Sequence, residues 1–257
     1  MLNFEHMGEL YPVALFIGIL LFIELGRRWG KRDLAKGGMA KGIGPLEAGV
    51  FGLLGLLLAF TFSGAMGRWE TRRALVVEET NDIGTAYLRL DLLQPADRTE
   101  LQGLFKEYVQ ARLDMYQALP NVEAAKKDLD RAEALQGAIW TLAVEAGARD
   151  SSHVSTRLLL PALNEMIDIT TTRTMALKAH PPVAIYFLLF VLSLAGSLIA
   201  GHGMAADSRR SWLHTLGYAL IMSASVHVII DLEFPRAGLI RIDAVDQALV
   251  HLLHSWP

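Results

Sequence analysis

The sequence predicts an all-α integral membrane protein with four transmembrane helices and a helical bundle inserted between the second and the third. Of its 257 residues, 52% are apolar and only 20% are charged, whereas soluble domains carry about 25% charged residues. The apolar residues gather in runs close to the ~20 residues that a helix needs to cross a bilayer. No stretch alternates with period two for long enough to predict a strand. The four runs are Met7–Leu25, Leu46–Met66, Val183–Ala200 and Trp212–Ile230.

We divide the chain into four segments at the ends of these runs. Residues 1–66 contain the first two spans, and residues 67–182 form an extramembrane helical insert that continues from the second. Residues 183–230 contain the last two spans, and residues 231–257 form a C-terminal segment. The first run is expected to remain as a span, because no Lys or Arg precedes it and no small-residue cleavage site follows.

The second span is predicted to continue without a break into the insert. No proline lies between Leu46 and Leu93, so we expect one helix far longer than the membrane is thick. Beyond the apolar run, one apolar stripe recurs at helical spacing; it consists of Trp69, Val76, Ile83, Tyr87 and Leu90. A charged stripe lies on another face and consists of Arg72, Glu79, Asp82 and Arg89.

Three further amphipathic helices are predicted in the insert. The pattern Asp97-x-x-Glu100 resembles a capping box at the start of the first. After the break at Pro120, Asn121 is expected to cap the second.

The last helix of the insert is expected to start at Ser151 or Ser152 and to kink at Pro161. It should end before Pro181. Each of these helices has an apolar stripe that must be buried against a neighbour, which predicts a bundle.

Three acids, Glu78, Glu79 and Asp82, lie within one and a half helical turns. Like charges at these spacings destabilise a helix, so something should neutralise them. A bound or permeating cation is the functional alternative. Within the chain the candidates are Arg89, Arg112 and Arg157.

Charges of both signs also crowd the exit of the fourth span. They are Asp231, Glu233, Arg236, Arg241 and Asp243. Such a group can bind a cation or latch a gate, or it can pair with the charged stripe of the long helix.

Several classes of function are excluded by composition and by missing motifs. The chain has no cysteine, which excludes disulfides and thiolate sites. The net charge of -3 lacks the excess of positive charge that is typical of nucleic-acid-binding proteins. We see no nucleotide-binding or hydrolase motif and only dispersed histidines. We therefore expect no enzyme activity, no metal and no cofactor.

The small residues Gly52, Gly55 and Ala59 follow one another at helical spacing in the second span. Small faces of this kind are typical of close packing between membrane helices.

The stretch from Gly55 to Arg73, with its apolar run followed by Arg-Trp-Glu-Thr-Arg, resembles the pore helix of bacterial bestrophins. The continuation to Leu93, together with the charged segment from Asp231 to Asp243, is similar to the bestrophin-like family of bacterial membrane proteins. The resemblance covers most of the chain.

This resemblance implies a homo-oligomeric ion channel, pentameric in bestrophins, that crosses the bacterial inner membrane several times. Its partners would be the lipid bilayer and small inorganic ions. The second helix would line the pore, with a neck at Leu54, Leu58 and Phe62. A shift of one residue in register would present the small face instead. The acidic run of the animal calcium clasp is missing, so calcium gating is not implied.

The same resemblance assigns ion access to charged residues of the long helix. They are Glu78, Glu79, Asp82, Arg72 and Arg89.

A competing hypothesis is a non-conducting scaffold or sensor whose insert binds a ligand or a partner protein. It predicts a monomer or a dimer. A secondary transporter is disfavoured, because the chain has few spans and no inverted repeat.

Overall fold

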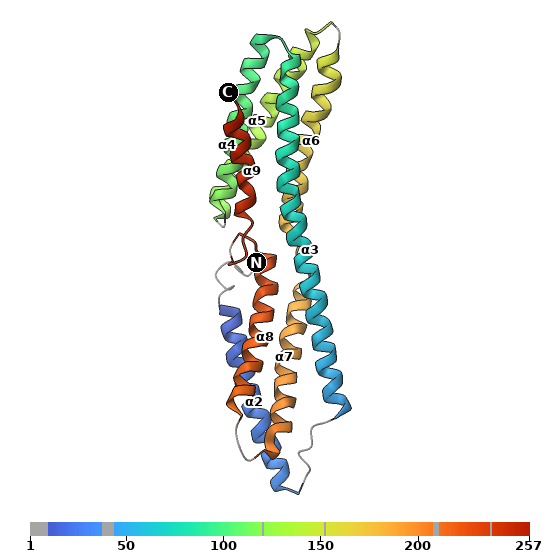
Figure 1. The fold of residues 1–257 in the computed structure, drawn as a ribbon, viewed down its shortest axis with the longest axis vertical. Coiled ribbons are helices and arrows are strands. Elements are labelled where there is room, and N and C mark those ends of the chain that lie inside the picture. Colours follow the sequence, from blue (N-terminus) through green and yellow to red (C-terminus); the bar gives the residue numbers. More distant parts are fainter. Residues whose placement is uncertain (1–9, 38–43, 120, 152, 208–210, 237) are drawn as a thin grey trace. The chain divides into compact units, whose positions relative to one another are not determined.

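The computed structural model describes residues 10–37, 44–119, 121–151, 153–207, 211–236 and 238–257, and these residues form helices without any strand (Figure 1). The predicted start of the first span at Met7, and Ser152, lie outside the described residues. The helices are α2 (Leu10–Ala35), α3 (Pro45–Arg89), the 3-10 turn η1 (Leu90–Leu92), α4 (Pro95–Ala118), α5 (Val122–Ala148), α6 (Val154–Lys178), α7 (Val183–Gly203), the 3-10 turn η2 (Met204–Ala206), α8 (Trp212–Glu233) and α9 (Asp243–Ser255).

Four helical stretches are long and apolar enough to cross a membrane, which confirms the predicted fold class. They are Leu10–Ala35, Glu47–Leu92, Val154–Ala206 and Trp212–Glu233. The long unbroken helix is also confirmed, because α3 runs for 45 residues.

The described chain folds as two compact units. Unit 1 comprises residues 1–67 and 180–234, and unit 2 comprises residues 68–179 and 235–257. Helix α3 contributes its first half to unit 1 and its second half to unit 2.

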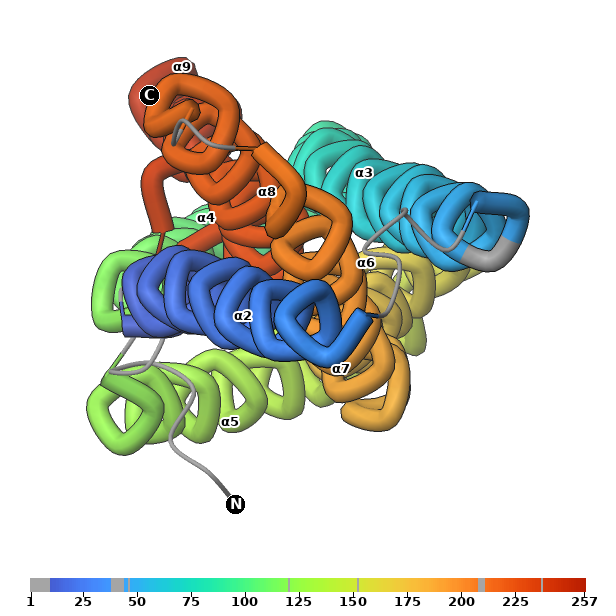
Figure 2. The backbone as a smooth tube through the Cα atoms, turned by 90° about the horizontal axis from the view of Figure 1, so that it is seen from below, coloured from blue at the N-terminus to red at the C-terminus, as the bar shows by residue number. Residues whose placement is uncertain are grey.

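In unit 1, α2 crosses α7 at backbone contact (Figure 2). A Cβ added at Gly26 would overlap the carbonyl oxygen of Leu198, and one added at Gly30 would lie 2.6 Å from the Cβ of Ala205. Gly201 of α7 is equally close to the carbonyl oxygen of Ile23. Small residues four apart let membrane helices approach in this way. None of these glycines was predicted from the sequence to be a packing site.

The apolar core of unit 1 is completed by the other helices. Its buried members are Leu15, Ile19 and Ile23 of α2, Leu54 of α3, Leu189 of α7, and Ala219, Met222, Val226 and Ile230 of α8.

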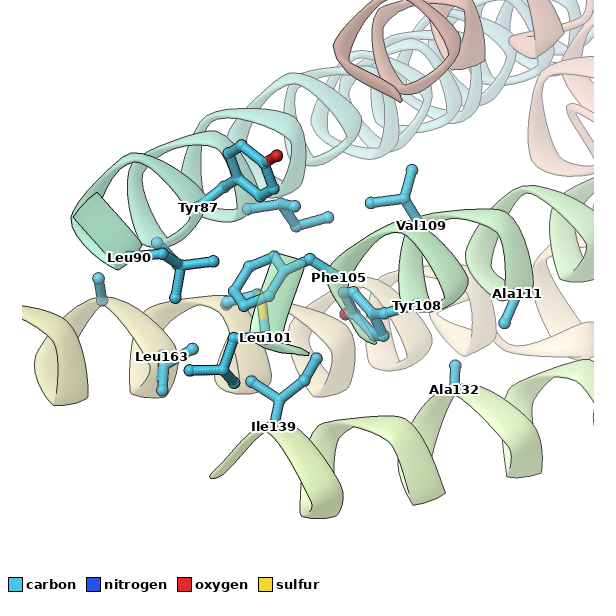
Figure 3. Close-up of a cluster of buried hydrophobic side chains, with 14 of the residues drawn as sticks. Tyr87, Leu90, Leu101, Phe105, Tyr108, Val109, Ala111, Ala132, Ile139 and Leu163 are labelled. Atoms are coloured by element: carbon cyan, nitrogen blue, oxygen red, sulfur yellow. The ribbon is translucent and has the colours of Figure 1, made fainter. Parts of the chain in front are cut away.

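In unit 2, the second half of α3 packs with α4, α5, α6 and α9 around one apolar core (Figure 3). The predicted apolar stripe enters this core at Ile83 and Tyr87 of α3 and at Leu90 of η1. Tyr87 also stacks on Trp256, which follows α9, at 3.8 Å between ring centroids.

Two of the predicted helix starts differ from the structure. The N-cap of α4 is Gln94, and Asp97 forms an ion pair at 2.6 Å with Arg149 instead of closing a capping box. Helix α6 follows a left-handed His153 and not a serine cap. The prediction for α5 is confirmed, because the Asn121 side chain accepts a hydrogen bond from the Ala124 amide at 3.1 Å.

Candidate functional site

The membrane-length part of α3 is the least covered of the four apolar stretches. Only 11% of its apolar window is buried, against 28%, 22% and 33% in the others. Added Cβ atoms at Gly49, Gly52, Gly55 and Gly67 would meet nothing within 4 Å. The exposed face consists of Gly49, Gly52, Leu53, Leu56, Ala59, Phe60, Ser63 and Gly67. The small face expected to serve close packing is therefore open in the single chain.

The three neck candidates lie in different environments. Leu54 is only 2% exposed and belongs to the core of unit 1, and Leu58 packs partly against the same core. Phe62 is 46% exposed. Leu56 and Phe60, which were not among the predicted neck residues, have exposed side chains. In an almost uniformly apolar helix, hydropathy does not indicate which side faces the protein's own core.

In unit 2, the acid at the centre of the predicted charged stripe is completely buried. Glu79 is 0% exposed, and its Oε1 accepts a hydrogen bond from the Nε of Arg112 at 2.6 Å. Its Oε2 accepts from Nη1 of Arg173 and, at 3.2 Å, from the Tyr116 hydroxyl. This cluster links α3, α4 and α6 through charge-assisted hydrogen bonds.

Arg112 was one of the three predicted neutralising residues, and its role is confirmed. Arg173 was missed, because it lies 94 residues from Glu79 and no local spacing connects the two. Burial, followed by the nearby charge of Arg236, lowers the pKa of Arg173 to about 9. Arg173 is therefore still protonated at neutral pH and pairs with Glu79 as a cation.

Three guanidinium groups surround the ring of Tyr116. Their central carbons lie 5.0 Å (Arg112), 4.0 Å (Arg173) and 4.8 Å (Arg236) from the ring centroid, within the range of cation–π attraction. Burial raises the pKa of Tyr116, so its hydroxyl keeps the proton that it donates to Glu79.

The other two acids of the predicted group remain near the surface. Glu78 is exposed, and Asp82 is half-buried. Burial raises the pKa of Asp82, and the negative charges of Glu78 and Glu165 raise it further. Glu78 and Asp82 are thus the acids of this stripe that an ion in solution can reach.

The two arginines of the predicted charged stripe bind main-chain oxygens. Arg72 is buried and donates to the carbonyl oxygens of Ala176 and Ala179, at 3.0 and 2.8 Å, at the end of α6. Arg89 donates to the Leu158 carbonyl oxygen at 2.5 Å. Both therefore hold α6 against α3.

The charges after the fourth span divide between the two units. In unit 2, Arg236 binds Asp246 of α9 through two hydrogen bonds of 2.6 and 3.0 Å. Asp243 pairs with Arg236 at 3.3 Å and with Arg241 at 2.5 Å. Asp246 was not among the predicted residues.

In unit 1, Asp231 and Glu233 are both buried. Glu233 lies 3.3 Å from Nδ1 of His180, whose ring stacks on Phe234. Among the described residues, no three His, Asp or Glu side chains gather in a way that could hold a metal ion.

Four helical stretches of membrane-spanning length, together with a helical unit that has buried charges in its core, define a helical membrane protein. The sequence profile of the Bestrophin-like domain matches residues 13–246. The chain therefore belongs to the bestrophin-like family, as its long second helix had indicated. No curated protein and no solved structure matches it.

Proposed function

We propose that this protein is an oligomeric ion channel whose pore is lined by α3. The observation that carries the proposal is the exposed face of α3. Between Gly49 and Gly67 this face alternates small residues with the large apolar side chains of Leu53, Leu56 and Phe60. Beyond Gly67 the same face continues with mostly polar exposed residues, which are Glu70, Thr71, Ala74, Glu78, Asn81 and Thr85.

A helix that lines both a membrane pore and an aqueous vestibule needs one face that is apolar in the membrane and polar beyond it. Several copies of α3 around a common axis would cover the face that a single chain leaves open. By resemblance to bestrophins we take the number of copies to be five, in the inner membrane of a bacterium.

The bulky side chains of this region would form the constriction. Leu56 is 52% exposed and lies on the central stripe of the open face, and Phe62 lies at its edge. A ring of such residues closes a pore by dewetting. Leu54 and Leu58 would support the constriction from behind in this arrangement. At the vestibule, the charges of Glu78 and Asp82 would change the local concentration of the ions that enter the pore.

Flux through liposomes that contain the purified protein tests the proposal. We expect small ions to pass, Leu56→Ala and Phe62→Ala to raise the flux, and Leu54→Ala to lower thermal stability instead. The mass of the detergent-solubilised particle should be that of a ring of subunits. Homogeneous rings that pass neither cations nor anions above the empty-liposome rate would refute a channel. Non-conducting monomers or dimers would favour the scaffold or sensor hypothesis.

A further inference from the structure

Unit 1 contains a cavity of about 740 Å³ between α2, η2 and the first turn of α8. This volume lies within the range of roughly 300–1,000 Å³ that is typical of small-molecule sites. On α2 the lining residues recur every three or four positions, so they form a single face of the helix. They are Ile17, Leu20, Leu21, Glu24 and Arg28, with Ile23 and Arg27 beside them.

Polar and apolar groups are separated along the cavity. Ile17, Leu20 and Leu21 lie within the apolar run of α2, whereas Glu24 and Arg28 lie about one to two turns further along. The polar end also receives the start of α8, at Ser211 and Trp212. A molecule with a polar head and an apolar tail matches this division.

Arg27 supplies a positive charge at the polar end. Its residue is 9% exposed, and Nη2 donates to the carbonyl oxygen of Asp207 at 3.3 Å. In the described structure its Nε is buried and has no hydrogen-bond partner. Arg27 also lines the cavity, so its guanidinium places a positive charge at the polar end. Arg28 is already paired with Glu24 at 2.9 Å.

The beginning of α8 adds a second attraction for negative charge. Ser211 occupies the N-cap; its hydroxyl is hydrogen-bonded to Nδ1 of His214 and does not cap the amides of the first turn. The N–H groups of the first turn of a helix have no hydrogen-bond partner within the helix, and they form the positive end of the helix dipole. Phosphate groups bind at such helix ends, and Ser211, Trp212, His214 and Thr215 all line the cavity.

We propose that this cavity binds a glycerophospholipid. Its phosphate lies between Arg27 and the first turn of α8, and one acyl chain follows Ile17, Leu20 and Leu21. Trp212, which is 57% exposed, lies at the rim, where tryptophan is enriched at membrane surfaces. A free phosphate would leave the apolar wall unused, and a neutral amphiphile would bring no negative charge to Arg27. The proposal does not depend on ion conduction.

Thermal shift and native mass spectrometry of the delipidated full-length protein in detergent test the site. Three additives are compared: phosphatidylglycerol, diacylglycerol with the same acyl chains, and inorganic phosphate. We expect phosphatidylglycerol to raise Tm saturably and to remain bound in the mass spectrum, and the other two to have little effect. An equal shift with diacylglycerol or with inorganic phosphate would overturn the proposal, and so would no shift with phosphatidylglycerol.

Two substitutions locate the binding. Arg27→Gln should weaken phosphatidylglycerol binding at least tenfold, and the matched control Arg32→Gln, on the same helix and outside the cavity lining, should leave it unchanged. Thr215→Trp fills the cavity from α8 and should also abolish binding, which keeps the test decisive if Arg27→Gln does not fold. Wild-type affinity in a folded Thr215→Trp protein, or equal losses in Arg27→Gln and Arg32→Gln, would refute the site.

Discussion

Replacing Glu79 with glutamine keeps the size of the side chain and removes the negative charge that three donors share. Arg112 and Arg173 would stay buried, with side chains only 1% and 5% exposed. Removing one partner of a buried ion pair costs about 3–5 kcal/mol, because the other charge is left without compensation. A loss of 1 kcal/mol lowers Tm by roughly 2–4 °C in a chain of 150–250 residues. Glu79→Gln should therefore lower Tm by about 6–20 °C.

The assay is the thermal unfolding of the full-length protein in detergent, followed by tryptophan fluorescence and by the loss of the monodisperse gel-filtration peak. Glu78→Gln is the matched control, because Glu78 is the preceding residue and is exposed; surface substitutions usually change stability by less than about 0.5 kcal/mol. The double variant Glu79→Gln with Arg173→Gln should lose less than the sum of the two single losses. A Glu79→Gln protein whose Tm lies within about 2 °C of wild type, a loss of about 1 kcal/mol or less, would show that the cluster does not stabilise the fold.

Three further outcomes are expected. Gly26→Leu should abolish the monodisperse protein, because even a Cβ overlaps the backbone of α7, whereas Gly52→Ala, at an open position, should be tolerated; equal behaviour of the two would contradict the packing. Asp82→Asn should raise Tm at pH 7 and raise it less at pH 4. The pKa of Asp82 is higher in the folded protein, so the wild-type protein loses stability as the pH rises through that pKa. A larger gain in Tm at pH 4 than at pH 7 would contradict the raised pKa. Trp256→Ala should lower Tm, since it removes the stacked contact with Tyr87, and such pairs contribute about 0.5–1.5 kcal/mol beyond their buried area; an unchanged Tm would show that α9 is held by other contacts.

The features predicted from the sequence were those encoded locally. Hydropathy located the four membrane-length helices, and the absence of proline predicted the continuity of α3. Spacing alone placed Ile83 and Tyr87 in a common core, and the residue type at Asn121 predicted a helix cap. Each of these depends on residues within a few helical turns of one another.

The features that the sequence did not reveal depend on which helices become neighbours. The contact of Gly26 with α7 and the pairing of Glu79 with Arg173 join distant parts of the chain. The orientation of α3 about its axis was equally inaccessible, because leucines and small residues surround it on all sides in the membrane-length part. The burial of Leu54 and the exposure of Leu56 become visible only when the neighbours of α3 are in place.

Unit 2 is built from two parts of the chain that are synthesised at different times. When residues 68–179 leave the ribosome, the Glu79 cluster can already form, but Leu249 and Trp256 are missing from the core, and neither Arg236 nor its partner Asp246 has yet been made. Two membrane-length helices must be made before these residues arrive. The bundle therefore reaches its final stability only after the whole membrane part has been translated. A chain that stalls in the third or fourth span would carry an incomplete bundle, which cellular proteases can recognise.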